Sequence, residues 1–385
     1  MVDVPQEYAG REQSYLKHSV LREYLTPWGF KLGGAARSIR GRTTLWYVDT
    51  FAGPWGTVAE SLDGTSVSIG LEVLATAQTA WRERGNDIDV GAVFVEKNPK
   101  SFSKLQALLS DYKGPVKCHA LQGRFGDRTT EIASIIGENP AFLFIDPTGW
   151  RGAEMEHVRK LVSLPRRDVL INVMYNFINR FKNDGRPYIR KSLEDFFGLE
   201  NDTLPADLSE EELMAFYRRN LKEHCGVRYS ADLFIQHPTV DRTWFRLVIG
   251  GSNPMVIRLF RDVERKVVGQ QSHNVRGAAK RRNREERTGQ GELDLLTTGI
   301  DDRYARLNEV GKAAIAEVAA GFLRARGETQ WRDLWPQILE DLHVTHSDAN
   351  KVVGGLCRQG HLRARGWMNR QQVPTEDNVL DLAQG

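Results

Sequence analysis

The sequence predicts an α/β protein in which a mainly parallel, Rossmann-like sheet is followed by a C-terminal winged-helix module. Two observations lead to this prediction. From Thr43 to about Val173, short apolar segments alternate with amphipathic segments whose apolar residues recur every three or four positions. In the tail, three amphipathic segments precede a short wing-like segment. Continuous apolar strands separated by helices are typical of a parallel sheet that helices cover on both faces.

Composition narrows the class of protein. The 385 residues are 41% hydrophobic and 27% charged, which is typical of globular proteins and argues against a long disordered chain. No stretch approaches the roughly 20 apolar residues of a membrane-spanning helix, and the first thirty residues show no secretory signal. We therefore expect a cytoplasmic protein without a membrane partner.

Cys118, Cys225 and Cys357 are too sparse for a disulfide framework or a zinc motif, so no metal is expected.

The elements follow one another in a regular order. Five strands are expected at residues 45–48, 92–95, 116–121, 141–145 and 169–171. Helical spacing between them covers 69–81, 102–109 and 155–162. A mostly helical, charged stretch then leads to two more strands, at 231–236 and 244–249. We take residues 1–270 as one domain.

The rest of the chain divides into a basic segment and a tail. Residues 276–287 hold six positive and two negative charges and no apolar residue larger than alanine, so residues 271–303 are expected to form a basic linker. Apolar stripes then mark helices at 310–322, 331–342 and 346–356, and residues 362–367 resemble a small wing. Residues 304–385 are therefore predicted to form the winged-helix-like domain.

Polar or small residues follow each of the five strands. Because the carboxyl ends of parallel strands meet at one edge, we expect these residues to surround a single ligand. The candidates, in chain order, are Asp49, Phe51, Ala52, Gly53 and Gly56 after the first strand, Glu96 and Lys97 after the second, Gly123, Arg124 and Phe125 after the third, Asp146 and Pro147 after the fourth, and Asn172 after the fifth.

A glycine-rich turn, then an acidic strand end, then a polar strand end and an Asp-Pro pair, is the layout of a Rossmann-like S-adenosylmethionine site. Glycine lets the backbone approach a ligand closely, and a carboxylate such as Glu96 can accept both hydrogen bonds of a ribose diol. Glu96 follows Gly53 by 43 positions, well beyond the roughly 20 of the dinucleotide fingerprint. This spacing disfavours a third interpretation, an NAD- or nucleotide-binding regulator.

Methyl transfer mainly requires that donor and acceptor are held in line. Asp146, with Pro147 and Asn172 close by, would orient an acceptor amine on a base. Trp150 or Tyr175 could stack on an extruded base, and the alternative for both residues is a core aromatic. Lys17 and His18 precede the first strand on a helix and are expected to reach the same edge.

Five segments resemble the three-Cys-motif partner (TcmP) family of bacterial and phage proteins. They are residues 17–25, 47–54, 94–99, 144–149 and 169–181, the last reading Val-Leu-Ile-Asn-Val-Met-Tyr-Asn-Phe-Ile-Asn-Arg-Phe. The likeness covers roughly residues 10 to 270. Two positions depart from the family pattern, since Thr148 replaces an aromatic residue and Trp55 stands where glycine is common.

This resemblance implies a class I methyltransferase-like domain and an enzyme that uses S-adenosylmethionine as cofactor. It also implies a possible partner with three cysteines that looks like an iron–sulfur radical protein. A second hypothesis follows, in which the chain is a non-catalytic, nucleic-acid-binding partner of such a modification or repair protein.

Positive charge in the basic segment and the tail points to nucleic acid as the acceptor. The net charge is only +3, so a nucleic-acid contact must be local. The alternative for the basic segment is a solvated linker, and a winged helix can also bind protein. The candidate phosphate contacts are Lys280, Arg281, Arg282, Arg284, Lys351, Arg358, Arg363 and Arg365.

Overall fold

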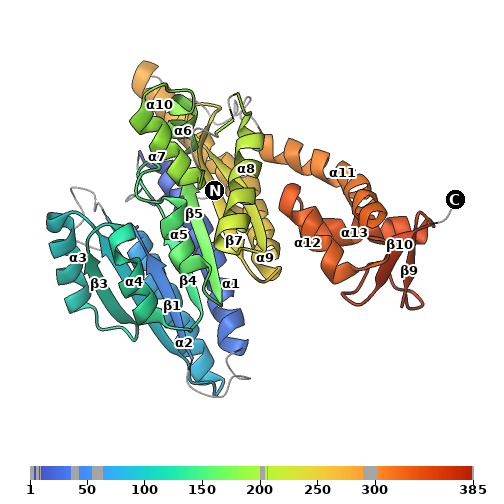
Figure 1. Cartoon of the computed structure of the whole chain (residues 1–385), viewed down its shortest axis with the longest axis horizontal. Helices are drawn as coiled ribbons and strands as arrows, with labels where there is room; N and C mark the ends of the chain where they lie inside the picture. Colours follow the sequence, from blue (N-terminus) through green and yellow to red (C-terminus); the bar gives the residue numbers. More distant parts are fainter. Residues whose placement is uncertain are drawn as a thin grey trace.

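The computed structural model describes residues 4–5, 8, 10–35, 43–53, 64–199, 204–205, 207–288 and 302–383. Within these residues, seven strands form one sheet in the order β3-β2-β1-β4-β5-β7-β6 (Figure 1). The strands are β1 (Thr44–Asp49), β2 (Asp89–Glu96), β3 (Lys117–Gln122), β4 (Ala141–Ile145), β5 (Arg167–Val173), β6 (Tyr229–Gln236) and β7 (Thr243–Gly251). All seven coincide with predicted strands.

The first five strands are parallel to one another, and β7 runs antiparallel to both of its neighbours. The chain moves outward from β1 to β3 and then crosses to β4 on the other side of β1. The carboxyl ends of β1 and β4 therefore flank the point where the strand order reverses, which is where open α/β sheets bind ligands. The Rossmann-like α/β class that the sequence predicts is confirmed.

Each strand sends alternate side chains into one of two apolar clusters. In β1, Leu45 and Tyr47 belong to one cluster, and Trp46 and Val48 belong to the other. On the first face lie α1 (Glu12–Ala35), α2 (Ser66–Glu83), α3 (Pro99–Asp111) and α9 (Met255–Lys266). On the second face lie α4 (Phe125–Ile136), α5 (Met155–Val162), α6 (Tyr175–Phe181), α7 (Pro187–Phe197) and α8 (Glu210–Cys225). Helices cover both faces, so the central strands β1 and β4 are almost entirely buried, whereas the edge strand β3 is partly exposed.

The basic segment differs from the predicted linker. After the short π-helix η3 (Val267–Gln271), residues Ser272–Thr288 form a helix, α10, whose first half is packed against the domain. Val275 and Ala279 are buried, and the Arg276 guanidinium donates to Oε1 of Gln236 at 2.6 Å and pairs with Asp241. Partners from other elements thus turn a charged segment into an ordered helix. The remaining linker residues, 289–301, lie outside the described part.

The C-terminal unit consists of helices and a small sheet that extend to one side of the main sheet in Figure 1. Its helices are α11 (Arg303–Arg326), α12 (Trp331–Asp341) and α13 (His346–Arg358), and its strands β8 (Thr329–Gln330), β9 (Leu362–Arg365) and β10 (Val379–Leu382) lie in the order β8-β10-β9. The three predicted helices and the first wing strand are present. Its identity as a winged-helix module stays a prediction.

Buried charges join this unit to the sheet domain. Arg261 of α9 donates to the backbone carbonyls of Leu339 and Glu340 on α12, at 2.8 and 3.1 Å. The Glu340 carboxylate accepts from the backbone N–H of Ser230 on β6 at 2.8 Å.

None of the described helices is long and apolar enough to cross a membrane.

Candidate functional site

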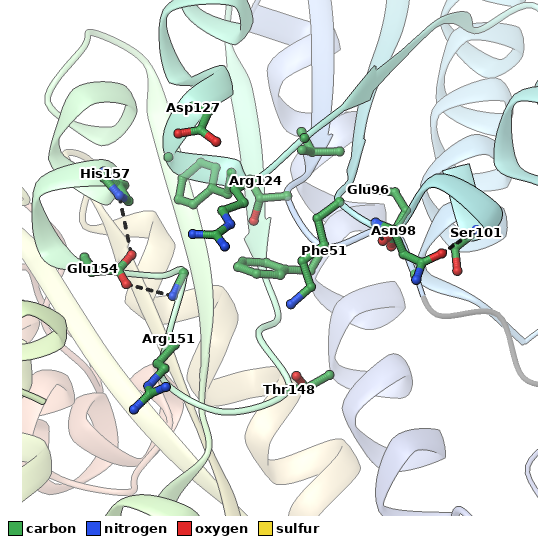
Figure 2. Close-up of a pocket in the computed structure, with 18 of the residues that line it drawn as sticks. Phe51, Glu96, Asn98, Ser101, Arg124, Asp127, Thr148, Arg151, Glu154 and His157 are labelled. Atoms are coloured by element: carbon green, nitrogen blue, oxygen red, sulfur yellow. Dashed lines mark hydrogen bonds and ion pairs between the residues drawn. The ribbon is translucent and has the colours of Figure 1, made fainter. Parts of the chain in front are cut away.

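A cavity of about 770 Å³ opens at the carboxyl ends of β1 to β4 (Figure 2). It brings together residues that follow four different strands, as the sequence predicts for this edge. Of the predicted cofactor residues, the following line it: Phe51, Gly53, Glu96, Lys97, Gly123, Arg124 and Phe125. Asp49, Ala52 and Asp146 are not among the lining residues, nor is the catalytic candidate Asn172. Gly56 falls outside the described residues.

Gly53 and Glu96 meet at the floor of the cavity. A Cβ at Gly53 would collide with Oε2 of Glu96, so only glycine fits there without displacing the carboxylate. The other oxygen, Oε1, accepts the backbone N–H of Asn98 at 2.5 Å. Asn98 in turn caps α3 by accepting from the backbone of Lys100 and Ser101. The carboxylate is therefore held in one place, with only 6% of Glu96 exposed.

Two aromatic rings form an apolar side of the cavity. Phe51 and Phe125 lie with ring centroids 6.1 Å apart. Gly123, at φ +143°, turns the chain between β3 and α4 and donates its N–H to the carbonyl of Glu96 at 3.0 Å. The sequence analysis places Phe125 after the third strand and predicts no helix there, whereas the structure makes it the first residue of α4. Figure 2 shows Phe51, Arg124 and Thr148 around the same space.

Asp49 supports the glycine turn from inside. Its Oδ1 accepts the N–H of Phe51 at 3.1 Å, and the hydroxyl of Tyr47 lies 3.5 Å from its Oδ2. Asp49 has no exposed surface, and burial raises its pKa to about 6. The N–H of Ala52 donates to the carbonyl of Val95 at 2.9 Å and so ties the turn to β2. Asp49 and Ala52 thus shape the cavity without lining it.

A second polar cluster lies beside the cavity, where β4 and β5 end. Asp146 forms an ion pair with Lys17 of α1, and its Oδ1 accepts from Nδ2 of Asn172 at 2.6 Å. The prediction that Lys17 reaches this edge is confirmed. Asn172 is 1% exposed, and its Oδ1 has no hydrogen-bond partner among the described residues. Pro147 follows Asp146 and leads to Thr148, which lines the cavity.

His18 adjoins the same cluster. Its Nδ1 lies 2.9 Å from the hydroxyl of Tyr8. Burial, together with the neighbouring Lys17 charge, lowers the pKa of His18 to about 3, so its ring is neutral at physiological pH. The positive charge beside Asp146 therefore belongs to Lys17.

The far wall of the cavity comes from residues that the sequence analysis missed. Arg151, Glu154, His157 and Ser192 all line it. Glu154 accepts the N–H of Gly152 at 2.9 Å and lies 3.5 Å from Nε2 of His157. Ser192 belongs to α7, more than forty positions after β4, and no motif marks it. The only available signal is the Gly149–Gly152 stretch after Asp146, which predicts a turn at the site edge.

Trp150 does not present a free ring for base stacking. It is 8% exposed, it packs against Phe181 with centroids 5.6 Å apart, and its Nε1 donates to Oγ of Ser192 at 2.9 Å. Tyr175 is half-buried against the second apolar cluster. The structure therefore favours the core-aromatic alternative for Trp150, whose indole links α7 to the loop beside the cavity.

The predicted phosphate contacts fall into two groups. On α10, Lys280 pairs with Asp241 at 3.0 Å and Arg282 pairs with the buried Glu12 of α1. Arg281 and Arg284 lie on the same helix. In the C-terminal unit, Lys351, Arg358, Arg363 and Arg365 are exposed. Arg358 donates to the carbonyl of Gln372 and Arg365 pairs with Glu328, whereas Lys351 and Arg363 form no ion pair within the described residues.

Neither a metal cluster nor a disulfide is found in the described part of the chain. No group of three His, Cys, Asp or Glu side chains there could hold a metal ion. Cys118, Cys225 and Cys357 are all free thiols. The groups that the described residues bring to the site are carboxylates, amides, aromatic rings and cations.

No protein-family model matches the chain, and no curated protein is similar to it in sequence. Among solved structures, cofactor-bound Rv0187 from MTB is 13% identical, with 65% of this chain and 82% of that chain covered and a TM-score of 0.29. An S-adenosylmethionine-dependent methyltransferase from Anabaena variabilis is 13% identical over 54% and 77% of the chains, with a TM-score of 0.23. Loganic acid methyltransferase with S-adenosylhomocysteine is 8% identical over 70% and 87%, with a TM-score of 0.28. These similarities concern part of the architecture, at low sequence identity.

Proposed function

We propose that this chain is an S-adenosylmethionine-dependent methyltransferase that acts on a nucleic acid. The observation that carries the proposal is the contact of Gly53 with Glu96 at the floor of the cavity, beside the Lys17–Asp146 pair. The Glu96 carboxylate is fixed next to Gly53, where no side chain blocks the approach to the backbone. This arrangement suits a ligand whose ribose diol comes close to the chain. A carboxylate and a cation at the adjoining strand ends suit an acceptor that must be oriented.

The cavity residues fit the cofactor group by group. Glu96 would accept the two ribose hydroxyls, because Oε2 faces the glycine turn and Oε1 is fixed by Asn98. The Phe51 and Phe125 rings would hold the adenine on its apolar faces. The backbone after Asp49 would shape the methionine end. S-adenosylmethionine, when bound, would supply a methyl group on a sulfonium, from which the neutral thioether is a good leaving group.

The protein's own contribution to transfer would be positioning. Asp146 is held at Oδ1 by Asn172 and at Oδ2 by Lys17, so its orientation is set before any acceptor arrives. Such preorganised polar groups need little rearrangement during reaction. The free Oδ1 of Asn172 is a further hydrogen-bond acceptor at the same strand ends. Together these groups would align an acceptor amine with the methyl group.

Cations around the cavity favour a polyanionic acceptor. Lys97, Arg124 and Arg151 line the cavity, are exposed and form no ion pair with a carboxylate within the described residues. Lys351 and Arg363 add exposed charge on the C-terminal unit, for which we propose a winged-helix role in binding the acceptor. Unpaired cations of this kind are typical phosphate contacts.

The test has two stages. Calorimetric titration with S-adenosylhomocysteine is expected to show one site per chain. Labelled S-adenosylmethionine is then offered with duplex DNA, single-stranded DNA and RNA, and labelled methyl is expected on at least one of them. Cofactor binding without transfer to any of these polymers would favour the non-catalytic partner of an iron–sulfur protein. Absence of cofactor binding would contradict the proposal.

A further inference from the structure

An exposed tyrosine stands at the rim of the cavity between two arginines. Tyr188, in the first turn of α7, is 59% exposed. Cζ of Arg151 lies 5.8 Å from the centroid of its ring, and Cζ of Arg186 lies 5.6 Å from it. Nη1 of Arg186 also donates to the Tyr188 hydroxyl at 3.1 Å. The ring is therefore accessible at the surface and is flanked by two guanidinium groups, one of which belongs to a residue that lines the cavity.

The position of the ring is tied to the cavity by two residues. Arg151 lines the cavity, and Figure 2 shows its side chain on the loop below Glu154. Ser192 also lines the cavity and lies four positions after Tyr188, so both project from the same side of α7. The bond from Trp150 to Ser192 fastens that side of the helix to the loop that carries Arg151. A nucleic-acid strand whose acceptor base enters the cavity would therefore pass over Tyr188.

The local structure keeps the ring in place. Asp184 accepts from Nε of Arg186 at 2.9 Å and from Nη2 at 2.6 Å, which fixes the guanidinium beside the ring. Pro187 follows Arg186 and begins the helix with a preset backbone angle. Arg151, by contrast, is exposed and forms no ion pair within the described residues. The Arg186 guanidinium thus fixes the tyrosine, and the Arg151 guanidinium offers a second planar group beside the ring.

We propose that Tyr188 is a stacking platform for an unpaired nucleobase next to the acceptor nucleotide, with Arg151 closing over that base. The inference rests on the proposed function, in which the acceptor is a nucleic acid. Aromatic rings and guanidinium planes both stack on bases that are out of the duplex. The cations Lys97 and Arg124 in the adjoining cavity, which form no ion pair within the described residues, complement phosphate charge. This combination fits a single strand better than an apolar ligand, which would gain nothing from the cations.

The experiment compares two fluorescent single strands of about twelve nucleotides, one of thymidines and one of the same length built from abasic residues. Binding to the full chain is measured for the wild type, Tyr188→Leu, Tyr188→Trp and Phe216→Leu. Phe216 is the matched control, because Arg219 lies 4.9 Å from its ring and it does not line the cavity. Calorimetry with S-adenosylhomocysteine is run on every variant.

We expect Tyr188→Leu to weaken binding of the thymidine strand by about 5- to 150-fold, the loss of one aromatic–base stack. The abasic strand should bind all variants alike, Tyr188→Trp should retain the wild-type affinity, and Phe216→Leu should match the wild type. Equal affinity of wild type and Tyr188→Leu for the thymidine strand would overturn the inference. So would wild-type binding of an acidic peptide but of neither strand. In both cases, unchanged S-adenosylhomocysteine binding would leave the cofactor assignment standing, whereas its absence in the wild type would remove the proposed function itself.

Discussion

Gly53 lies so close to Oε2 of Glu96 that the two positions constrain each other. A side chain at residue 53 would occupy the place of the carboxylate, and the carboxylate fills the space that glycine leaves. The turn after β1 and the end of β2 are therefore matched parts of one ligand cradle. This relationship makes the cofactor site testable by substitution at either position.

Glu96→Ala should weaken S-adenosylhomocysteine binding by about 1.5–3 kcal/mol, the range for losing hydrogen bonds to a charged group. Gly53→Ala should give a similar loss, because the new methyl group displaces the same carboxylate. The double variant should bind no more weakly than the worse single variant, since residues in contact are not additive. Calorimetry measures all three. Fully additive losses would show that the two positions act independently and would contradict a shared cradle.

Asp146→Asn should abolish methyl transfer while the protein stays folded and binds S-adenosylhomocysteine nearly as well as the wild type. The physical reason is that Asp146 lies beside the cavity and not in its lining, so it serves the acceptor more than the cofactor. Single-turnover transfer of labelled methyl is the measurement. Wild-type turnover in this variant would assign acceptor orientation to another group.

Lys17→Met should destabilise the fold by about 3–5 kcal/mol, because it leaves the carboxylate of Asp146 without its ion partner in a largely buried place. Adding Asp146→Asn should restore part of that loss, since the unpaired charge is then gone. Urea unfolding of both single variants and the double variant checks this prediction. An equal free energy of unfolding for Lys17→Met and the wild type would show that water screens the Lys17–Asp146 ion pair.

Asp49 should make stability depend on pH in the acidic range. Burial raises its pKa from 3.8 to about 6, so folding favours the protonated carboxyl. This contribution is fully present below about pH 4 and is lost as pH rises through about 6. Relative to wild type, Asp49→Asn should therefore gain up to about 3 kcal/mol between those two values, for a shift of about two pKa units. Urea unfolding at several pH values tests it, and a constant difference would contradict it.

Nucleic-acid binding should depend more on the C-terminal unit than on α10. Lys280 and Arg282 are already paired with Asp241 and Glu12, whereas Lys351 and Arg363 are exposed and form no ion pair in the described part. On duplex DNA, Lys351→Ala with Arg363→Ala should lower the logarithmic salt slope by about 0.9 per lost contact.

The matched variant changes Lys280, Arg281, Arg282 and Arg284 to alanine. The logarithmic salt slope of this variant should fall by less than the loss of four phosphate contacts would cause. The reason is that at least two of these cations already form ion pairs within the chain. A larger fall in this variant than in the C-terminal one would return the phosphate-binding role to α10. If neither variant differs from the wild type in its logarithmic salt slope, other cations form the phosphate contacts.

The sheet was predictable because its strands are apolar on both faces. Val48 and Leu143, for example, are fully buried, and strands of this kind produce uninterrupted apolar segments. The edge of the sheet that holds the site followed from the rule that ligands bind at the carboxyl ends of parallel strands. Asp49, Glu96 and Asp146 could therefore be placed near one another without coordinates.

What could not be predicted depends on pairings between distant segments. Arg276 reads as a solvated charge until Gln236 and Asp241, from another part of the chain, surround it. Trp150 reads as a free ring until Ser192 accepts its indole N–H. Spacing along the chain carries no information on such partners. The same holds for Tyr188, whose neighbour Arg151 comes from the loop after β4.

The burial of Arg261 between α9 and α12 limits where the protein can be divided for expression or engineering. A fragment ending before α11 would retain this guanidinium on its surface without the carbonyls of Leu339 and Glu340, and would leave the N–H of Ser230 without its carboxylate. The apolar cluster that begins at Leu16 also includes Trp335 and Leu380, so such a cut would expose core side chains. The two units should therefore be expressed and exchanged together, and chimaeras that swap only the C-terminal unit would need a matching α9 and β6.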